Sequence, residues 1–330
     1  QDMQYQYLVL DGYTKGYSHE KEKKECEDYS EHYIDSQNRY AIAAVCDGHS
    51  ASLCFRSNKG AELGCKTAIE KLSAFFDGYF QLSEDKIDNG WIFDTKERHL
   101  NRLKKSIIQA WNTKVSEDIG QHPYTEEELS ALKPEERKYC ESPIYQNHAY
   151  GSTFIAVGMC KDFHIILQIG DGTVLLLEDG KFTFPLPEDE KGRYGAPTSL
   201  PDGDVLSRKD AFRVDIRSAS PEAVFVMSDG IGDKKPELLE HILTSFMKNL
   251  KDIEAEDYEN DYNELNIGQK EYLMSMLQYF ADKNHGPEDD CSLAGMFCLT
   301  LSEEGEITSK EETQKEQAEN DGMKEAVDVN

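Results

Sequence analysis

Basic residues are scarce in this chain of 330 residues. Lysine and arginine together number 36, against 64 aspartates and glutamates, which gives a formal net charge of -28 at pH 7. Such a surplus of negative charge repels the phosphate backbone of nucleic acids and the headgroups of anionic membranes. We therefore expect neither a nucleic-acid partner nor a membrane partner, and any phosphate chemistry would need cations at the site.

Long apolar runs and paired cysteine motifs are also missing. No stretch approaches the roughly 20 apolar residues of a membrane-spanning helix, and residues 1–10 lack the basic and then apolar pattern of a signal peptide. The eight cysteines include no C-x-x-C pair, and several lie in apolar runs. We expect reduced thiols in a protein core and a cytoplasmic location.

Short apolar runs alternate with segments of helical spacing. The apolar runs predict strands at residues 5–10, 40–45, 153–158, 163–169, 173–177, 182–184, 211–216, 223–227 and 292–301. Apolar residues at helical spacing predict helices at residues 51–80, 100–115, 238–250 and 271–281. The charged segment 16–27 has the composition of a loop. The dipeptides Asp171-Gly172 and Asp179-Gly180 predict hairpin turns within an antiparallel meander.

The chain divides into one large domain and a tail. We expect a catalytic domain over residues 1–301, with a polar, proline-containing insertion at about 117–147. Residues 185–208 are rich in proline and glycine, a composition typical of a loop or flap over a site. Residues 302–330 contain ten acids against three lysines and few large apolar residues, so we expect a disordered tail.

Four acid-centred motifs lie between or beside the apolar runs: Glu27-Asp28, Asp47-Gly48-His49, Asp229-Gly230 and Asp289-Asp290. A tight turn alone would explain one Asp-Gly pair. Three apolar strands that each have an aspartate at one end are poorly explained by turns, because a cluster of uncompensated carboxylates is costly without cations. Carboxylate and carbonyl oxygens are the ligands of Mg²⁺ and Mn²⁺, so the pattern predicts one divalent-cation centre assembled from distant strand ends.

The ordered motifs carry a family resemblance. The segments are ECEDYS (25–30), AVCDGHSAS (44–52), YGSTFIAVGM (150–159), LQIGDGTVLLLEDGK (167–181), VFVMSDGIGD (224–233) and DDCSLAGMF (289–297). Together they resemble the PP2C-like family of metal-dependent protein serine/threonine phosphatases, and most of all its bacterial branch. The resemblance implies an α+β fold: a four-layer α/β/β/α sandwich with two central antiparallel sheets flanked by helices.

The resemblance also implies a site with two Mn²⁺ or Mg²⁺ ions. By this resemblance Asp47 would bridge both ions, Asp229 and Asp289 would hold the first, and Glu27 with the Gly48 carbonyl would hold the second.

Three further acids have positions in the family pattern. Asp28 would act in the outer shell through water. Asp171 would help to bind a third, weaker ion, although a role as a turn residue is the alternative, and Gly172-Thr173 follows it where the family usually has Ser-Arg. Asp290 stands where the family usually has asparagine.

The activity implied is hydrolysis of phosphoserine and phosphothreonine monoesters by direct attack of a water held between the two cations. His49 would be the general acid beside the catalytic Asp47. The implied partners are phosphoprotein substrates and a cognate serine/threonine kinase pathway. The family's phosphate-binding arginine has no counterpart shortly before Glu27.

Candidates to replace that arginine are Lys23, Lys24 and His19. Lysine is a point charge without the bidentate fork of arginine, and a solvated charged loop is the other interpretation of this segment. Two other functions stay open from the sequence: a catalytically silent regulatory or binding module with the same fold, and a hydrolase of small phosphoesters.

Overall fold

The structure is a computed structural model. It describes residues 4–84, 91–187, 198–232, 239–241, 243–245, 247–248, 267–284, 288–301 and 307–308. The predicted tail at 302–330 lies outside the described residues except for 307–308. The predicted flap and the predicted helix at 238–250 are described only in part.

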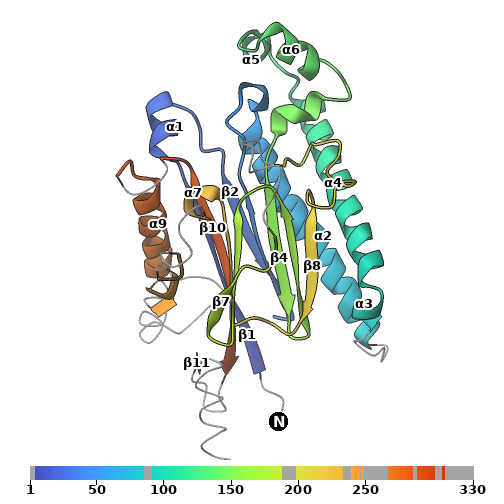
Figure 1. Cartoon of the computed structure of the whole chain (residues 1–330), viewed down its shortest axis with the longest axis vertical. Helices are drawn as coiled ribbons and strands as arrows, with labels where there is room; N and C mark the ends of the chain where they lie inside the picture. Colours follow the sequence, from blue (N-terminus) through green and yellow to red (C-terminus); the bar gives the residue numbers. More distant parts are fainter. Residues whose placement is uncertain are drawn as a thin grey trace, which may run out of the picture.

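The strands form two antiparallel sheets (Figure 1). In the first sheet the order is β1-β10-β9-β6-β7, with β11 also paired to β10, and in the second it is β2-β3-β4-β5-β8. The first sheet consists of β1 (Gln4–Thr14), β6 (Thr173–Glu178), β7 (Lys181–Thr183), β9 (Ala223–Met227), β10 (Cys291–Leu301) and β11 (Ile307–Thr308). The second consists of β2 (Tyr29–Ile34), β3 (Tyr40–Cys46), β4 (Phe154–Cys160), β5 (Phe163–Ile169) and β8 (Arg213–Ser218).

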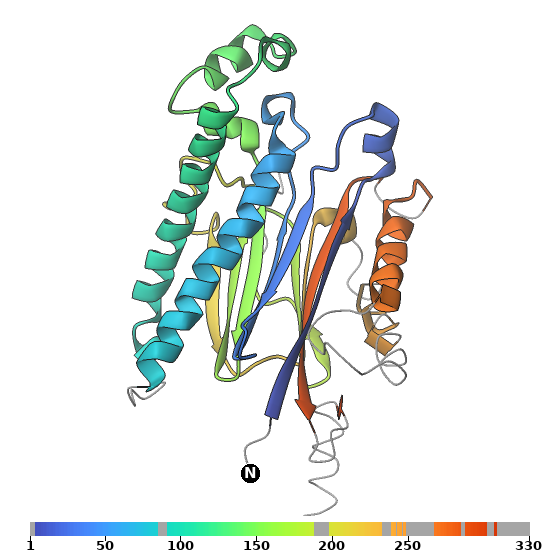
Figure 2. The ribbon, with the colours of Figure 1, turned by 180° about the vertical axis from the view of Figure 1, so that it is seen from behind.

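Helices cover both outer faces of this pair of sheets. The long helices α2 (Ser57–Glu84) and α4 (Lys96–Gln121) lie on the second sheet, and α9 (Ile267–Ala281) lies on the first, as the two opposite views show (Figure 1; Figure 2). The shorter elements are α1 (Tyr17–Glu22), η1 (Ser52–Cys54), α3 (Trp91–Asp94), α5 (Glu126–Ser130), α6 (Pro134–Cys140), η2 (Gln146–Tyr150) and α7 (Asp229–Gly232). The predicted α/β/β/α sandwich is confirmed.

Strand β3 shows why the apolar run at 40–46 is continuous. Tyr40, Ile42 and Cys46 point into the core beneath α2 and α4. The intervening Ala43 and Val45 point into the core between the two sheets. Because side chains alternate between the two faces of a strand and both faces are covered here, every position of β3 is buried.

The register of the strands places the ends of several strands at the same end of the sandwich. Cys46 at the end of β3 pairs with Tyr29 at the start of β2. On the other sheet, Met227 at the end of β9 has two partners. Thr173 at the start of β6 pairs with it on one side, and Leu293 near the start of β10 pairs with it on the other. The segments just beyond these strand ends therefore meet, although they are far apart in sequence.

Some local predictions were wrong. The predicted meander does not exist, because β5 and β6 belong to different sheets, and Asp171-Gly172 turns the chain from one sheet to the other. Asp179-Gly180 does form the predicted hairpin between β6 and β7, with positive φ at both residues. The segment 16–27, predicted as a loop, contains the helix α1. Strand β2 was not predicted, because its charged side chains break the apolar pattern.

None of the eight cysteines, all of which are described, forms a disulfide, and seven are buried. Within the described part of the chain, the helices include none that is both long enough and apolar enough to cross a membrane.

Phe76 tests the packing of the helix layer on the second sheet. Its ring is fully buried and stacks between Tyr40 (centroids 4.9 Å apart) and Phe163 (5.3 Å). We expect Phe76→Ala to lower the free energy of unfolding by about 3–5 kcal/mol, because it removes the ring and leaves a cavity. The control Leu82→Ala lies on the same helix but is 41% exposed, and should change stability by less than about 1 kcal/mol. Urea denaturation of both variants checks this, and equal losses would contradict the packing described.

Candidate metal centre

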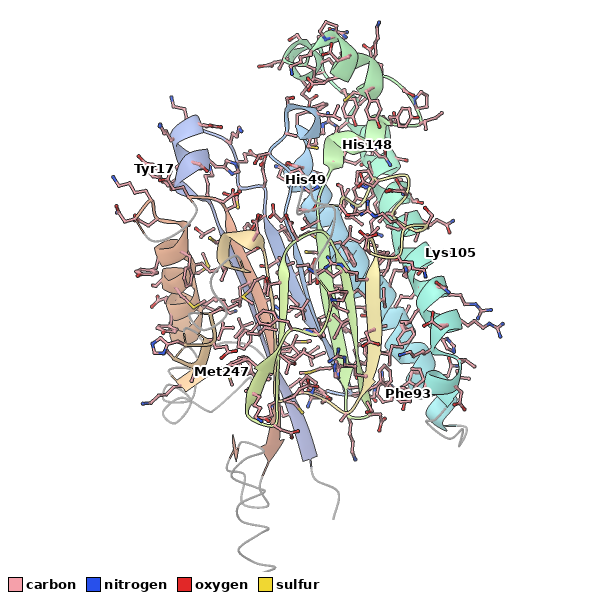
Figure 3. The ribbon with its side chains drawn as sticks, viewed as in Figure 1. Tyr17, His49, Phe93, Lys105, His148 and Met247 are labelled. Atoms are coloured by element: carbon pink, nitrogen blue, oxygen red, sulfur yellow. The ribbon has the colours of Figure 1, made fainter. Side chains whose placement is uncertain are left out.

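A cavity of about 560 Å³ opens at the end of the sandwich where the strand ends meet. Its described lining is formed by His19, Asp47, Gly48, His49, Ser50, Ala51, Cys54, His148, Gly151, Thr153, Asp171, Ser199, Pro201, Asp202, Asp229, Asp289 and Asp290. Two of its histidines, His49 and His148, are labelled in Figure 3, below the short helices α5 and α6. Among these described lining residues there is no lysine or arginine, so the lining is dominated by acids and histidines.

Aspartates from four different segments meet beside this cavity. Asp47 follows β3, and the carboxyls of Asp28 and Asp229 lie within hydrogen-bonding distance of its own carboxyl. Burial raises the pKa of Asp47 well above its usual range, and the charges of Asp28, Asp229 and Asp289 raise it further. Carboxyls can stay this close only if protons are shared between them or if cations offset their charge.

Asp28 is the most deeply buried member of this cluster. Its side chain is 3% exposed, and one carboxyl oxygen accepts a hydrogen bond of 2.7 Å from the Ser292 hydroxyl. Burial raises the pKa of Asp28 to about 7, against the opposing effect of hydrogen bonds from Ser228 and Ser292. The two hydroxyl groups hold Asp28 in place behind Asp47.

Asp290 acts as a support for the backbone around the site. It is 3% exposed, and its two carboxylate oxygens accept hydrogen bonds from the backbone N–H of Gly16 (2.7 Å) and of Glu27 (2.6 Å). One oxygen also lies 2.9 Å from Nδ1 of His19. The adjacent Asp289 lines the cavity as well, but is less buried than Asp290. Asp290 therefore ties β10 to the segment that carries Glu27.

Glu27 and Gly48 lie against each other. The Gly48 N–H donates a hydrogen bond of 3.1 Å to the Glu27 carbonyl, and the Glu27 carboxylate accepts one from the Ser50 hydroxyl. A Cβ atom on residue 48 would lie 2.7 Å from the Glu27 carbonyl oxygen and 2.8 Å from the backbone carbon of Ser57. Only glycine permits this approach, which explains the glycine after Asp47.

His49 lines the cavity beside Gly48. Its backbone N–H donates a hydrogen bond of 3.0 Å to the Gly151 carbonyl, and its Nε2 atom is buried. The structure thus brings the imidazole to the same cavity as Asp47.

Asp171 reaches this cavity from the β5–β6 crossing. The following residue must be glycine, because a Cβ atom there would lie 2.4 Å from the Ile155 side chain and 2.6 Å from the Met227 carbonyl oxygen. This packing accounts for Gly172 in the position where the family pattern has serine.

The three candidates for phosphate binding are placed differently. His19 is 5% exposed, lines the cavity, and accepts or donates a hydrogen bond of 3.0 Å at Nε2 with the Ser50 hydroxyl. Lys24 is exposed and pairs with Glu22 at 2.8 Å, which raises its pKa, with smaller effects from Glu27 and Asp289. Lys23 is exposed at the end of α1. Of the three, only His19 lines the cavity.

The donor set suits divalent cations, although the carboxyls contact one another. In the part of the chain that the structure describes, no group of three or more His, Cys, Asp or Glu side chains is arranged to hold a metal ion as it stands. The carboxyl oxygens of Asp47, Asp229 and Asp289 are nevertheless the hard ligands that Mg²⁺ and Mn²⁺ select. Their mutual repulsion means that cations would stabilise the cluster, so the residues fit such ions by chemistry and burial.

Comparison with known protein families gave a match to the model for protein phosphatase 2C over residues 15–263. The chain belongs to the protein phosphatase 2C family. The family predicted from the sequence motifs is confirmed. The matched range ends before Asp289, which β10 carries to the same cavity as Asp47.

Solved phosphatase structures resemble this member of the protein phosphatase 2C family. The serine-threonine phosphatase 2C from Toxoplasma gondii is 11% identical with a TM-score of 0.53, and the match covers 90% of this chain and 96% of that protein. The catalytic domain of PstP, solved in complex with two manganese ions, is 16% identical with a TM-score of 0.47, covering 89% and 99%. PppA from Pseudomonas aeruginosa, described as a regulatory component, is 12% identical with a TM-score of 0.48, covering 89% and 100%. No curated protein sequence gave a significant match.

Several residues of the cavity lining were not predicted from the sequence, among them Ser199, Asp202 and His148. Ser199 and Asp202 come from the described half of the predicted flap, and the Leu200 N–H donates a hydrogen bond of 2.9 Å to the Ser152 carbonyl. The Asp202-Gly203 pair was a usable signal for Asp202. His148 follows a polar segment without a motif, and nothing in its local sequence indicated a place in the cavity.

The buried carboxyl of Asp28 predicts how the stability of this protein depends on pH without divalent cations. Because the pKa of Asp28 is raised, the folded chain binds more protons than the unfolded chain between about pH 4 and pH 7. The contribution of this carboxyl to stability is therefore fully present below about pH 4 and is lost as the pH rises through about 7. Urea denaturation in the presence of a chelator, from about pH 5 to about pH 8, should show that Asp28→Asn has a less negative slope of unfolding free energy against pH than the parent chain. Identical slopes would contradict the assignment.

Proposed function

We propose that this member of the protein phosphatase 2C family is an active, Mn²⁺- or Mg²⁺-dependent protein phosphatase that hydrolyses phosphoserine and phosphothreonine monoesters. The observation that carries the proposal is the cluster of Asp47, Asp229 and Asp289 in the lining of a cavity that also contains His49, with the buried Asp28 beside Asp47. A structural role alone gives no reason to gather four mutually repelling carboxyls at an open cavity.

Asp47, Asp229, Asp289, Glu27 and the Gly48 carbonyl would hold two cations. When bound, two such ions lower the pKa of a water molecule and neutralise the phosphoryl oxygens of a substrate. Asp28 would orient Asp47 from behind.

Asp171, which also lines the cavity, would take part in binding a third ion. Bound cations would be needed to neutralise the substrate phosphate, because the acidic cavity without ions repels a phosphate group. The net charge of -28 on the chain adds to this repulsion.

His49 would supply the proton to the leaving oxygen. The alkoxide of serine or threonine is a poor leaving group, and a proton donor within reach lowers the barrier to its departure. The hydrogen bond from the His49 backbone to Gly151 fixes the base of this side chain at the cavity wall.

Phosphate binding in this protein would differ from that in a phosphatase with an arginine at this position. His19 is the candidate that lines the cavity, whereas Lys24 is engaged by Glu22 at 2.8 Å. We infer that the phosphate is held chiefly by the cations and by histidines. The implied substrates are phosphoproteins, with a kinase of the same specificity acting in the opposite direction.

Phosphate release from a phosphothreonine peptide tests the reaction and its dependence on metal. We expect turnover with Mn²⁺, no turnover with excess EDTA, and a loss of at least about 100-fold for Asp47→Asn, since even outer partners of metal ligands are worth about 10–100-fold. The control Asp179→Asn makes the same change in the exposed hairpin between β6 and β7, where asparagine tolerates the positive φ, and should keep full activity. Turnover in EDTA, or full activity of Asp47→Asn, would exclude the proposal.

The choice of phosphoester tests the role of His49 and the two alternative functions. We expect His49→Gln to slow hydrolysis of a phosphothreonine peptide by about 100-fold or more, but to affect p-nitrophenyl phosphate much less, because nitrophenolate leaves without a proton. An equal loss on both substrates would contradict the acid role. Mn²⁺ binding without hydrolysis of any phosphoester would identify a silent module, and turnover of small phosphorylated metabolites alone would identify a small-molecule hydrolase.

A further inference from the structure

Two short helices form a cap at the open end of the sandwich. We define the cap as residues 122–150, which include α5, α6 and η2 (Figure 1). Arg56, just before α2, holds it in place through two hydrogen bonds to Glu128 (2.7 and 3.0 Å) and one to the Tyr150 hydroxyl (2.9 Å). The guanidinium also lies 4.7 Å from the centre of the Tyr124 ring. The cap is thus firmly attached to the metal-centre end.

The cap also reaches the loop that follows Asp47-Gly48-His49. The Ser52 hydroxyl donates a hydrogen bond of 2.8 Å to the carboxylate of Glu136 in α6. His148, from η2, lines the cavity itself. The cap therefore forms part of the cavity wall, although His148 lies about a hundred residues after Asp47 in sequence.

An aromatic stack extends from His148 toward the surface. The rings of Tyr139 and Tyr145 are parallel, with centroids 4.3 Å apart, and His148 packs edge-on against both at 5.1 and 6.1 Å. Beside the stack, Ile144 is 76% exposed and Tyr145 is 42% exposed. We call Tyr139, Pro143, Ile144 and Tyr145 the shelf.

The exposure of the shelf is not required by folding. Among the large hydrophobic residues that the structure describes, Ile144 is the most exposed. Apolar and aromatic groups gathered at the mouth of a cavity are typical of a binding surface, because burying them on association is favourable. The shelf is continuous with the cavity through His148, so a ligand in the cavity that is long enough would cross it.

Charge indicates what kind of chain would cross the shelf. The cap contains six acids and three basic residues. Arg137 is already paired with Glu126 (3.1 Å) and Glu141 (2.8 Å), while Glu127 and Glu135 are exposed. Together with the acidic cavity, this favours a positively charged partner. An arginine side chain suits both features, since it can stack on tyrosine and be attracted by the acids.

We propose that the shelf binds the polypeptide beside the phosphorylated residue and favours substrates with arginine in that flanking segment. This inference rests on the proposed phosphatase activity and adds a substrate class to it. A phosphopeptide with acidic flanks is repelled, and a small phosphoester that never reaches the shelf is unaffected by it.

The test uses two phosphothreonine peptides of equal length, one with arginine and one with glutamate flanks, together with p-nitrophenyl phosphate. The double variant Ile144→Ser/Tyr145→Ala removes the exposed Ile144 side chain and the half-exposed ring that stacks on Tyr139. Tyr279→Ala is the matched control, because Tyr279 is 54% exposed and lies on α9, which covers the first sheet. We expect the parent chain to have the lower KM for the arginine peptide. In the double variant that KM should rise about 10-fold, with kcat and the hydrolysis of p-nitrophenyl phosphate unchanged.

Equal KM values for the two peptides in the parent chain, or an unchanged KM in the double variant, would overturn the inference. A shift of molecular mass in solution caused by the double variant would assign the shelf to a second copy of this chain and would overturn it as well. Fluorescence anisotropy with the same labelled peptides measures binding without turnover. It therefore tests the shelf even if no phosphoester is hydrolysed, which is the result that would instead refute the proposed function.

Discussion

The repulsion among the buried carboxyls at one end of the sandwich is the constraint on which the site depends. Asp28, Asp47, Asp229 and Asp289 come from four segments that are separated in sequence, and each adds negative charge close to the desolvated carboxyl of Asp47. A folded chain can keep such a cluster only if protons or cations offset the charge. The same feature that weakens the metal-free protein would therefore favour the binding of divalent cations.

The rest of this end of the molecule holds the repelling groups in place. Hydroxyls of Ser228 and Ser292 hold Asp28, and Asp290 holds the backbone of Gly16 and Glu27. These supports lie on or beside β9 and β10 of the first sheet, and they hold the segment that leads into β2 of the second sheet. A core between the sheets packs the two together. A rigid frame of this kind keeps ligands close before any ion arrives, which reduces the ordering that binding requires.

The sequence predicted those parts of the structure that depend on local pattern. The two-sided burial of β3 follows from its unbroken apolar run, and the Asp179-Gly180 hairpin follows from turn chemistry. The family resemblance correctly predicted the sandwich, which periodicity alone did not. The crossing at Asp171-Gly172 could not be predicted from local sequence, because the same dipeptide suits a hairpin, and the partner strands decide which sheet β6 joins.

In the site, too, some features follow from local sequence and others depend on tertiary structure. The acids at strand ends were found because they lie beside apolar runs, and the structure brings Asp47, Asp229 and Asp289 to one cavity. Their roles as metal ligands, like the role of His49, stay predictions. His148 and the shelf depend on how the cap folds back over the cavity, which is a tertiary arrangement that no motif in residues 122–150 specifies.

The most direct measurement is a crystal structure of the protein grown with Mn²⁺, with anomalous diffraction recorded at a wavelength where manganese scatters strongly. Two anomalous peaks should lie about 2.2 Å from carboxylate oxygens of Asp47, one also contacting Asp229 and Asp289 and the other Glu27, with the carboxyls of Asp47 and Asp229 moved apart. A cavity without anomalous peaks, in which the carboxyls still contact one another, would contradict the account.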